Sequence, residues 1–235
     1  MQIKVASYNI RKAVGLDWRR RPARVLTVLS EIGADIVALQ EVDRRFGSRI
    51  TALDPETIEK ETDYRAIRFA ERPQSLGHHG NVILARKSFT VVRAYPMALP
   101  HLEPRGAAVA DLDCGGGMLL RVVGMHLGLT RKWRTLQTET VVRELQSLEA
   151  RMPTVLMGDL NEPSLKSGVL RAFEQGHTIA SPGPSYHATM PLFSLDRIIV
   201  TENIAIAETG VHNSILSREA SDHLPIWANL KLPVA

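Results

Sequence analysis

The chain has 235 residues, of which 44% are hydrophobic and 23% are charged, and this composition excludes disordered, collagen-like and coiled-coil proteins. Lys and Arg total 29 against 25 Asp and Glu, and the resulting net charge of +4 is far below that of a histone-like tail. The single cysteine, Cys114, excludes an intramolecular disulfide and a zinc site made of several thiolates, and it favours a reduced, cytoplasmic setting.

The N-terminal segment MQIKVASYNI alternates like a β-strand and has no basic segment followed by a long apolar one, so we expect no signal peptide. No apolar run approaches the roughly 20 residues that span a bilayer, so we expect no stable membrane insertion. No feature of the sequence indicates an obligate protein partner.

Short β-branched runs bounded by Gly, Pro and Asp predict a long series of strands. They cover residues 3–10, 35–40, 64–70, 81–86, 89–94, 107–112, 118–127, 154–157, 196–201, 205–212 and 226–232. The segment Asp-Cys-Gly-Gly-Gly at 113–117 predicts a hairpin turn, because glycine tolerates positive φ. Several consecutive strands are therefore expected to be antiparallel neighbours.

Three helices are predicted between these strands. Residues 22–32 begin with a proline and end before Gly33, and residues 131–151 carry an apolar stripe at 3- and 4-residue spacing. The third helix, 164–174, follows Pro163. Strands that outnumber singly inserted helices indicate an α/β (α+β) fold with two packed sheets and helices on their outer faces. Without a linker or an internal repeat, residues 1–235 are expected to form one domain.

Polar side chains stand at or just past the C-terminal ends of otherwise apolar strands. They are Asn9, Glu41, His126, Asp159 and Asn161, to which Asp196 and the pair Asp222-His223 are added. Because a strand that has crossed the core delivers its last side chain to the rim of the sheet, these residues could converge on one site.

Each of these residues also has a plain structural explanation. Asn9 could begin a turn, Glu41 could be the first solvated residue after a buried strand, and Gly-Asp-Leu-Asn at 158–161 could be a turn and helix cap. The adjacent acid and imidazole of Asp222 and His223 are harder to explain in this way. Each structural explanation is adequate for its own residue, but together they do not account well for the whole set.

The ligand chemistry of the set indicates a metal-dependent reaction. Two carboxylates and an amide, from Glu41, Asp222 and Asn9, are hard oxygen donors suited to Mg²⁺ or Mn²⁺. Zinc would require more imidazole or thiolate ligands.

The remaining polar side chains suit proton transfer. They are the two imidazoles of His126 and His223 and the carboxylates of Asp159 and Asp196. Since no nucleophilic Ser or Cys stands with them, the set favours direct attack by water on a phosphate ester.

The motifs that carry these residues match a known family in order. They are Tyr8-Asn9-Ile10-Arg11, Leu39-Gln40-Glu41-Val42, Gly80-Asn81-Val82-Ile83-Leu84, His126-Leu127, Gly158-Asp159-Leu160-Asn161-Glu162-Pro163, Leu195-Asp196-Arg197-Ile198 and Ser221-Asp222-His223-Leu224-Pro225. From residue 7 to residue 225 the chain resembles the endonuclease/exonuclease/phosphatase superfamily, which includes deoxyribonucleases, abasic-site endonucleases, sphingomyelinases and inositol phosphatases. It looks most like the compact bacterial members of that deoxyribonuclease-like group.

The resemblance implies a four-layer αββα sandwich with two mainly antiparallel sheets, and it implies roles for single residues. Asn9, Glu41 and Asp222 would hold the divalent metal. His223 would contact the scissile phosphate, and Asp196 would orient the His223 ring. Asp159 would position or deprotonate the attacking water, and Asn161 would donate a hydrogen bond to the phosphate. His126 would act in acid/base catalysis. Arg105 resembles an arginine that reaches the phosphate.

One departure affects His126. The deoxyribonuclease branch supplies a glutamate to pair with this histidine, whereas residues 76–80 here read Leu-Gly-His-His-Gly and offer no carboxylate. His78 and His79 could contact substrate or belong to a glycine-flanked loop. The arginines at 19–21 could form a basic lip over the site or simply be solvated.

Three functions of the chain are compatible with these residues to different degrees. The first is hydrolysis of a phosphodiester in nucleic acid, DNA or RNA, by an endo- or exonuclease-like enzyme, which the mildly basic surface favours. The alternative is a phospholipid headgroup or small phosphate ester as substrate. The third, a non-catalytic phosphate- or nucleic-acid-binding module that keeps the fold, is disfavoured because all the proposed metal and proton-transfer residues are present.

Overall fold

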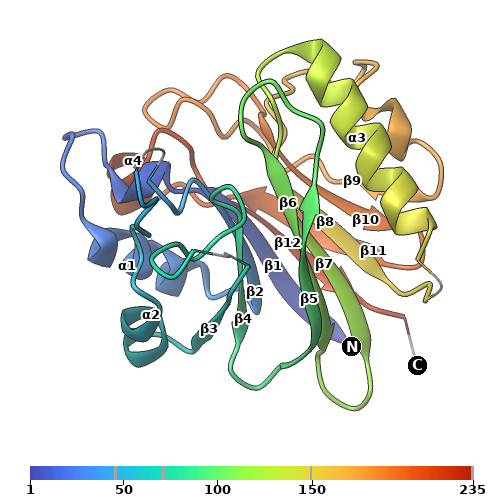
Figure 1. The fold of residues 1–235 in the computed structure, drawn as a ribbon, viewed down its shortest axis with the longest axis horizontal. Helices are drawn as coiled ribbons and strands as arrows, with labels where there is room; N and C mark the ends of the chain where they lie inside the picture. Colours follow the sequence, from blue (N-terminus) through green and yellow to red (C-terminus); the bar gives the residue numbers. More distant parts are fainter. Residues whose placement is uncertain (45–46, 70–71, 149, 234–235) are drawn as a thin grey trace.

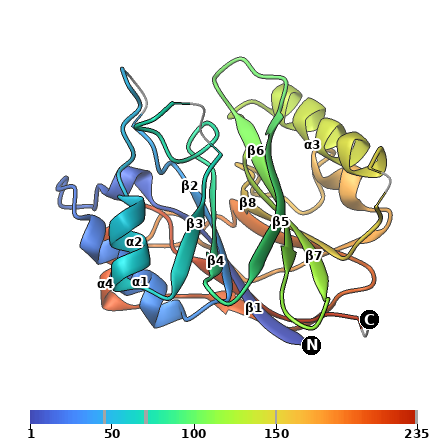
Figure 2. The same ribbon diagram turned by 60° about the horizontal axis from the view of Figure 1, so that its bottom comes forward.

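Two six-stranded β-sheets form the centre of the molecule and pack face to face (Figures 1 and 2). The structure is a computed structural model, and it describes residues 1–44, 47–69, 72–148 and 150–233. Apolar side chains from both sheets, such as Val5, Ile83, Leu120 and Met157, share one buried cluster between them. The sheets are held together by this apolar layer.

The first sheet has the strand order β11-β12-β1-β2-β4-β3. Its strands are β1 (Gln2–Asn9), β2 (Ile36–Gln40), β3 (Tyr64–Ile67), β4 (Val82–Arg86), β11 (Ala205–Val211) and β12 (Ile226–Lys231). Strands β1 and β2 are parallel, and the other neighbours are antiparallel.

The second sheet has the order β5-β6-β7-β8-β10-β9. Its strands are β5 (Thr90–Ala98), β6 (Gly106–Asp113), β7 (Leu119–His126), β8 (Thr154–Asp159), β9 (His177–Ile179) and β10 (Asp196–Thr201). Here β7 and β8 are the parallel pair. The predicted hairpin turn joins β6 to β7, where the Cys114 amide donates to the Met118 carbonyl at 2.9 Å.

Helices cover the outer face of each sheet. The helices α1 (Pro22–Ile32), α2 (Pro55–Glu61) and α4 (Ile215–Ala220) share an apolar cluster with the first sheet, and α3 (Arg131–Gln146) shares one with the second. The short 3₁₀ turns are η1 (Arg11–Ala13) and η2 (Leu170–Phe173). The predicted α/β four-layer sandwich is therefore confirmed.

Two predicted helices are shorter in the structure. The helix expected over 131–151 ends at Gln146, because the chain must become extended before Pro153 to enter β8, and residue 149 lies outside the described residues. The helix expected over 164–174 is only the turn η2, whose Leu170 and Phe173 are buried. The Thr138 hydroxyl of α3 donates to the Val169 carbonyl just before it, at 2.9 Å, and fixes the loop there.

The strand expected over 64–70 ends at Ile67, and residue 70 lies outside the described residues. Sequence patterns also missed α2, α4 and β9, which have 7, 6 and 3 residues. Such short helices carry little apolar periodicity and depend on their N-caps. Asp54 accepts from the Thr57 amide at the start of α2, and Ser214 forms a capping box at the start of α4.

Within the described ranges, none of the helices has both the length and the apolar composition that crossing a membrane requires.

Gly158 of β8 is expected to be intolerant of any side chain. It pairs with Met125 of β7, and a Cβ at this position would lie 1.8 Å from the Met125 carbonyl oxygen. We expect Gly158→Ala to lower the free energy of unfolding by about 2–3 kcal/mol through this overlap, and the melting temperature by roughly 5–10 °C. The control is Gly168→Ala, whose Cβ would meet only the Arg131 guanidinium at 3.4 Å. Equal melting temperatures for the two variants would contradict this account of the β7–β8 pairing.

Candidate active site

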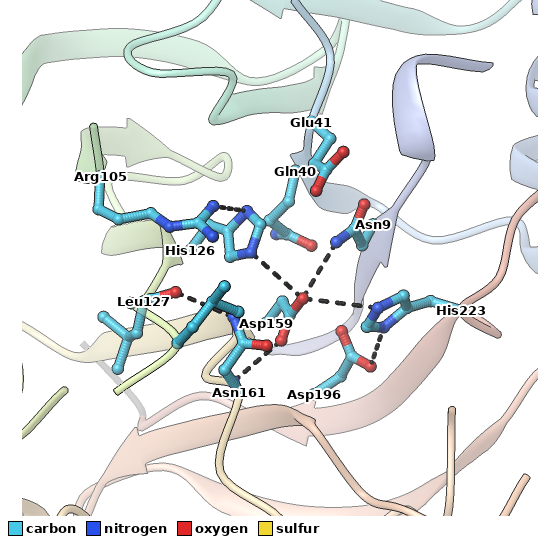
Figure 3. Close-up of polar contacts among 12 residues, drawn as sticks. Asn9, Gln40, Glu41, Arg105, His126, Leu127, Asp159, Asn161, Asp196 and His223 are labelled. Carbon is cyan, nitrogen blue, oxygen red and sulfur yellow. Dashed lines mark hydrogen bonds and ion pairs between the residues drawn. The ribbon is translucent and has the colours of Figure 1, made fainter. Parts of the chain in front are cut away.

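The two parallel strand pairs bring predicted site residues to one edge of the sandwich. In the first sheet Asn9 lies in register with Gln40, and Glu41 follows directly. In the second sheet His126 lies in register with Asp159. Because parallel neighbours end at the same edge, four of the predicted residues are delivered there by strand pairing alone (Figure 3).

Asp196 and His223 reach the same edge from the opposite chain direction. Asp196 is the first residue of β10, which is antiparallel to β8, and it pairs with Asp159. His223 precedes β12, which is antiparallel to β1. Asp196, Asp222 and His223 thus stand at or before the beginnings of their strands, as the predicted strands 196–201 and 226–232 place them, because an antiparallel strand presents its beginning where its neighbour ends.

The carboxylate of Asp159 is the centre of the site (Figure 3). Its Oδ2 atom accepts a hydrogen bond from Asn9 Nδ2 at 3.0 Å and lies 3.4 Å from His126 Nε2 and 3.6 Å from His223 Nε2. Its Oδ1 atom accepts from the Asn161 amide at 2.9 Å. Asp159 is only 2% exposed, so this carboxylate depends on protein donors from both sheets.

His223 is held as a cation by Asp196. Its Nδ1 atom lies 2.9 Å from Asp196 Oδ2, which also accepts from the Ser185 hydroxyl at 2.5 Å. Burial disfavours the charged ring, but the Asp196 charge and hydrogen bond, with the charges of Asp159 and Asp222, raise the pKa of His223 to about 10. Both ring nitrogens therefore carry protons at neutral pH, with Nε2 directed at Asp159.

His126 faces the same carboxylate but is neutral. Burial is the main cause that lowers its pKa to about 4, and Arg105 lowers it further against the opposing charge of Asp159. Arg105 Nη1 lies 2.9 Å from His126 Nδ1. Because a guanidinium can only donate, Nδ1 is the acceptor and the single ring proton is on Nε2, toward Asp159. The Nδ1 partner of His126 is thus an arginine, whereas the deoxyribonuclease branch pairs this histidine with a glutamate.

The three predicted metal ligands are oxygen donors that already contact other groups of the protein. Glu41 forms an ion pair with the Lys12 ammonium, and Asp222 Oδ2 lies 3.6 Å from Arg11 Nε. Asn9 Oδ1 accepts from the Arg11 amide at 3.1 Å. The Lys12 and Arg11 side chains are partly exposed, so a divalent cation could displace them. The donor set fits Mg²⁺ or Mn²⁺.

A second group of possible metal ligands overlaps the proton-transfer residues. Ligand atoms of Asp159, Asp196 and His223 lie within 4.8 Å of one another, and all three residues are buried. The 2.9 Å contact between His223 Nδ1 and Asp196 Oδ2, with Nε2 of the same ring 3.6 Å from Asp159 Oδ2, also suits the transfer or orientation of a proton.

Asn161 and Arg105 lie at the borders of the group. Asn161 has a φ of +51°, and its Nδ2 donates to the Leu127 carbonyl at 2.9 Å, so the end of β7 fixes its amide. Arg105 stands just before β6 and lines the same pocket as Glu41 and His126. By contrast, the arginines at 19–21 are exposed and lie outside the lining of that pocket.

Sequence reasoning missed the buried ion network beneath the site. Arg197 is 1% exposed and donates to the backbone carbonyls of Asp196 and Glu162 at 3.0 and 3.1 Å. The Glu162 carboxylate accepts from Arg134 Nη2 at 3.1 Å. This network joins the loop after β8 to the start of β10 and so fixes Asp159 relative to Asp196. The available signal was a charged residue, Arg197, inside an otherwise apolar strand.

The sequence profile of the Endonuclease/Exonuclease/phosphatase family matches residues 6–223. This match covers nearly the whole chain, including both strand pairs and the site, and the chain belongs to that family. The family consists of hydrolases of phosphate esters that depend on divalent metals. The comparison with curated protein sequences finds no match.

Solved structures share the fold at low sequence identity. An endonuclease/exonuclease/phosphatase from Beutenbergia cavernae has a TM-score of 0.76 and 20% identity, over 100% of this chain and 72% of that one. The mannosyl-6-phosphatase Bt3783 of Bacteroides thetaiotaomicron has a TM-score of 0.78 and 18% identity, over 98% and 100%. TDP2 of D. rerio complexed with single strand DNA product has a TM-score of 0.75 and 18% identity, over 98% and 99%. At these identities the likeness establishes the fold.

The low pKa of His126 predicts a pH dependence of stability. Between pH 6.5 and about 4 the unfolded chain binds a proton that the native site refuses, so the native state loses stability as the pH falls through this window. The contribution has a slope of up to about 1.4 kcal/mol per pH unit. We expect His126→Gln to remove it, as measured by the difference in urea unfolding free energy between pH 7 and pH 5. Identical pH slopes in the variant and the native chain would contradict a neutral buried His126.

Proposed function

We propose that the chain is a divalent-metal-dependent phosphodiesterase that cleaves by direct attack of water, with nucleic acid as its substrate. The observation that carries this proposal is the single Asp159 carboxylate that faces Asn9, His126 and His223 at one edge of the two sheets. Such an arrangement can hold a water molecule, accept its proton and present positive charge to a phosphoryl group. No cysteine or serine is needed as a nucleophile.

Each residue of the site would have a separate role in the reaction. Asp159 would orient the water and accept its proton, on the face of the carboxylate that the two histidine rings approach. His223, a cation held by Asp196, would donate from Nε2 to a phosphoryl oxygen. The Asn161 amide, fixed by Leu127, would donate a further hydrogen bond to the transition state, and Arg105 would bind a phosphate oxygen.

Asn9, Glu41 and Asp222 would hold Mg²⁺ or Mn²⁺. When bound, the ion supplies positive charge that offsets the charge on the phosphoryl oxygens. Lys12 and Arg11 balance the carboxylates of Glu41 and Asp222 in the metal-free protein, and both side chains can then turn toward solvent or substrate.

Metal dependence is the first test of the proposal. We expect hydrolysis of bis-p-nitrophenyl phosphate in the presence of Mg²⁺ or Mn²⁺ and none after EDTA treatment. Glu41→Gln should raise the Mg²⁺ concentration needed for half-maximal rate by roughly 10- to 100-fold, because it removes a charged ligand. Glu139→Gln, an exposed carboxylate on α3, is the matched control. Activity that survives chelation would refute the metal assignment.

The role of Asp159 gives a second test. Asp159→Asn keeps the volume of the side chain but cannot accept the proton of an attacking water, so kcat should fall by about 10²–10⁴-fold. Circular dichroism and the melting temperature show whether the variant is folded. A folded variant with the native rate would exclude Asp159 as the group that activates water.

Nucleic acid is favoured as substrate by the net positive charge and by the basic side chains of Lys12 and Arg105 in the pocket. TDP2 of D. rerio, which has this fold, was solved with a single strand DNA product. The competing candidate is a small phosphate ester or phospholipid headgroup, favoured by the fold shared with a mannosyl-6-phosphatase. A panel of plasmid, single-stranded DNA, RNA, abasic duplex, sphingomyelin, cardiolipin and inositol phosphates separates them. Cleavage of lipids or small esters alone would overturn the choice of nucleic acid.

A further inference from the structure

A pocket of about 350 Å³ extends from the site toward the loops of the first sheet. Glu41, Arg105 and His126 line its inner end, so it opens directly beside the groups assigned to the reaction. Its outer wall carries three further arginines, Arg44, Arg49 and Arg72, together with His78 and His79. The proposed reaction assigns no role to this outer wall.

The acidic side chains of the pocket are already engaged. Asp43 accepts from the Ser75 hydroxyl at 2.8 Å and from two backbone amides at 2.9 and 3.0 Å, which fixes the loop around residues 75–77. Glu41 pairs with Lys12. Glu103 accepts from the Leu129 amide at 2.8 Å and lies 3.8 Å from Arg105. Among the described residues that line the pocket, five Lys and Arg side chains stand against these three carboxylates, so the net charge of the lining stays positive.

The three arginines of the outer wall have no carboxylate partner within residues 1–44, 47–69, 72–148 and 150–233. Arg72 Nη1 donates to the Gly47 carbonyl at 3.1 Å, and Arg49 Nη1 lies 3.4 Å from His79 Nδ1. Each guanidinium has five N–H groups, so most donors of Arg49 and Arg72 remain for another acceptor. A pocket with surplus guanidinium charge and free donors favours an anion.

His79 fixes Arg49 without reducing its charge. Burial, with the charges of His78 and Arg49, lowers the pKa of His79 to about 4, so its Nδ1 is an acceptor at neutral pH. The ring is held in a tight space, because a Cβ on Gly106 would lie 3.1 Å from His79 Cδ2. A Cβ on Gly80, the residue that follows His79, would lie 3.3 Å from the Glu41 Cα. The arginine is thus positioned by the same backbone segment that packs against Glu41.

We propose that Arg49, Arg72 and Arg44 form a second anion subsite, which binds another phosphate group of the substrate while the scissile phosphate lies at Asp159. This inference rests on the proposed phosphodiesterase function and adds a substrate requirement to it. A substrate with two phosphates fits the site, and the second phosphate is either the next one along a nucleic acid strand or one carried by a small phosphorylated molecule. A monoester with a single charge centre leaves the subsite unfilled.

The test compares ligands that differ by one phosphate. We measure binding of thymidine 5′-monophosphate, thymidine 3′,5′-bisphosphate and the dinucleotide pTpT to the full chain by calorimetry, and their inhibition of bis-p-nitrophenyl phosphate hydrolysis. We expect the ligands with two phosphates to bind at least roughly tenfold more tightly than the monophosphate, since a charge-assisted contact is worth about one such factor. Preference for pTpT indicates a strand, and preference for the bisphosphate alone indicates a small molecule.

Arg49→Met keeps the length of the side chain and removes the charge, and it should abolish most of this preference while binding of the monophosphate stays within about threefold. Arg72→Met is a second variant with the same expected effect, so that the test can still be decided if one of the two variants misfolds. Arg143→Met, an exposed arginine on α3, is the control and should change neither value. Equal affinities for one and two phosphates in the native chain, or a preference that both variants retain, would overturn the subsite. Hydrolysis of bis-p-nitrophenyl phosphate by the same preparation is the separate measure of the proposed function.

Discussion

The carboxylate of Asp159 is buried where the two sheets meet, and a charged group in such a place is stable only if the protein supplies donors to it. The groups that face it come from far apart in the chain: Asn9 at the end of β1, which donates a hydrogen bond, and the rings of His126 at the end of β7 and His223 before β12. These contacts are possible only while both parallel strand pairs keep their register and both sheets keep their spacing. The close packing of Gly158 on β7 and the apolar layer between the sheets therefore help to maintain the geometry of the site.

Two histidines contact one carboxylate and have opposite charge states because their second partners differ. Asp196 faces His223 Nδ1 and stabilises the cation against burial, whereas burial keeps His126 neutral and Arg105 at its Nδ1 adds to that effect. The carboxylate of Asp159 thus faces one cationic ring and one neutral ring.

The sequence predicted the layers of the fold and the group of residues that meet at one edge, because apolar alternation marks the strands and polar residues interrupt it at strand ends. It did not predict which nitrogen of each histidine faces which charge, because the contact between Arg105 and His126 depends on how the start of β6 lies beside the end of β7. It also missed α2 and α4, whose few residues owe their helical form to caps and to packing on the first sheet. The direction of β10 was equally hidden, and with it the reason that Asp196 pairs with Asp159.

The carboxylates of the site have different partners according to how deeply they are buried. The innermost carboxylates, Asp159 and Asp196, have hydrogen bonds from buried side chains, while the outer ones, Glu41 and Asp222, pair with the partly exposed cations Lys12 and Arg11. A cation that enters from solvent meets only the outer pair in exchangeable contacts, since displacing donors from the inner pair would leave buried polar groups unpaired. Under the proposed assignment, a metal ion would therefore exchange at Glu41 and Asp222 while the contacts of Asp196, His223 and Asp159 with one another stay intact. The depth of each carboxylate thus separates the contacts that can exchange with solvent from those that hold the buried groups in place.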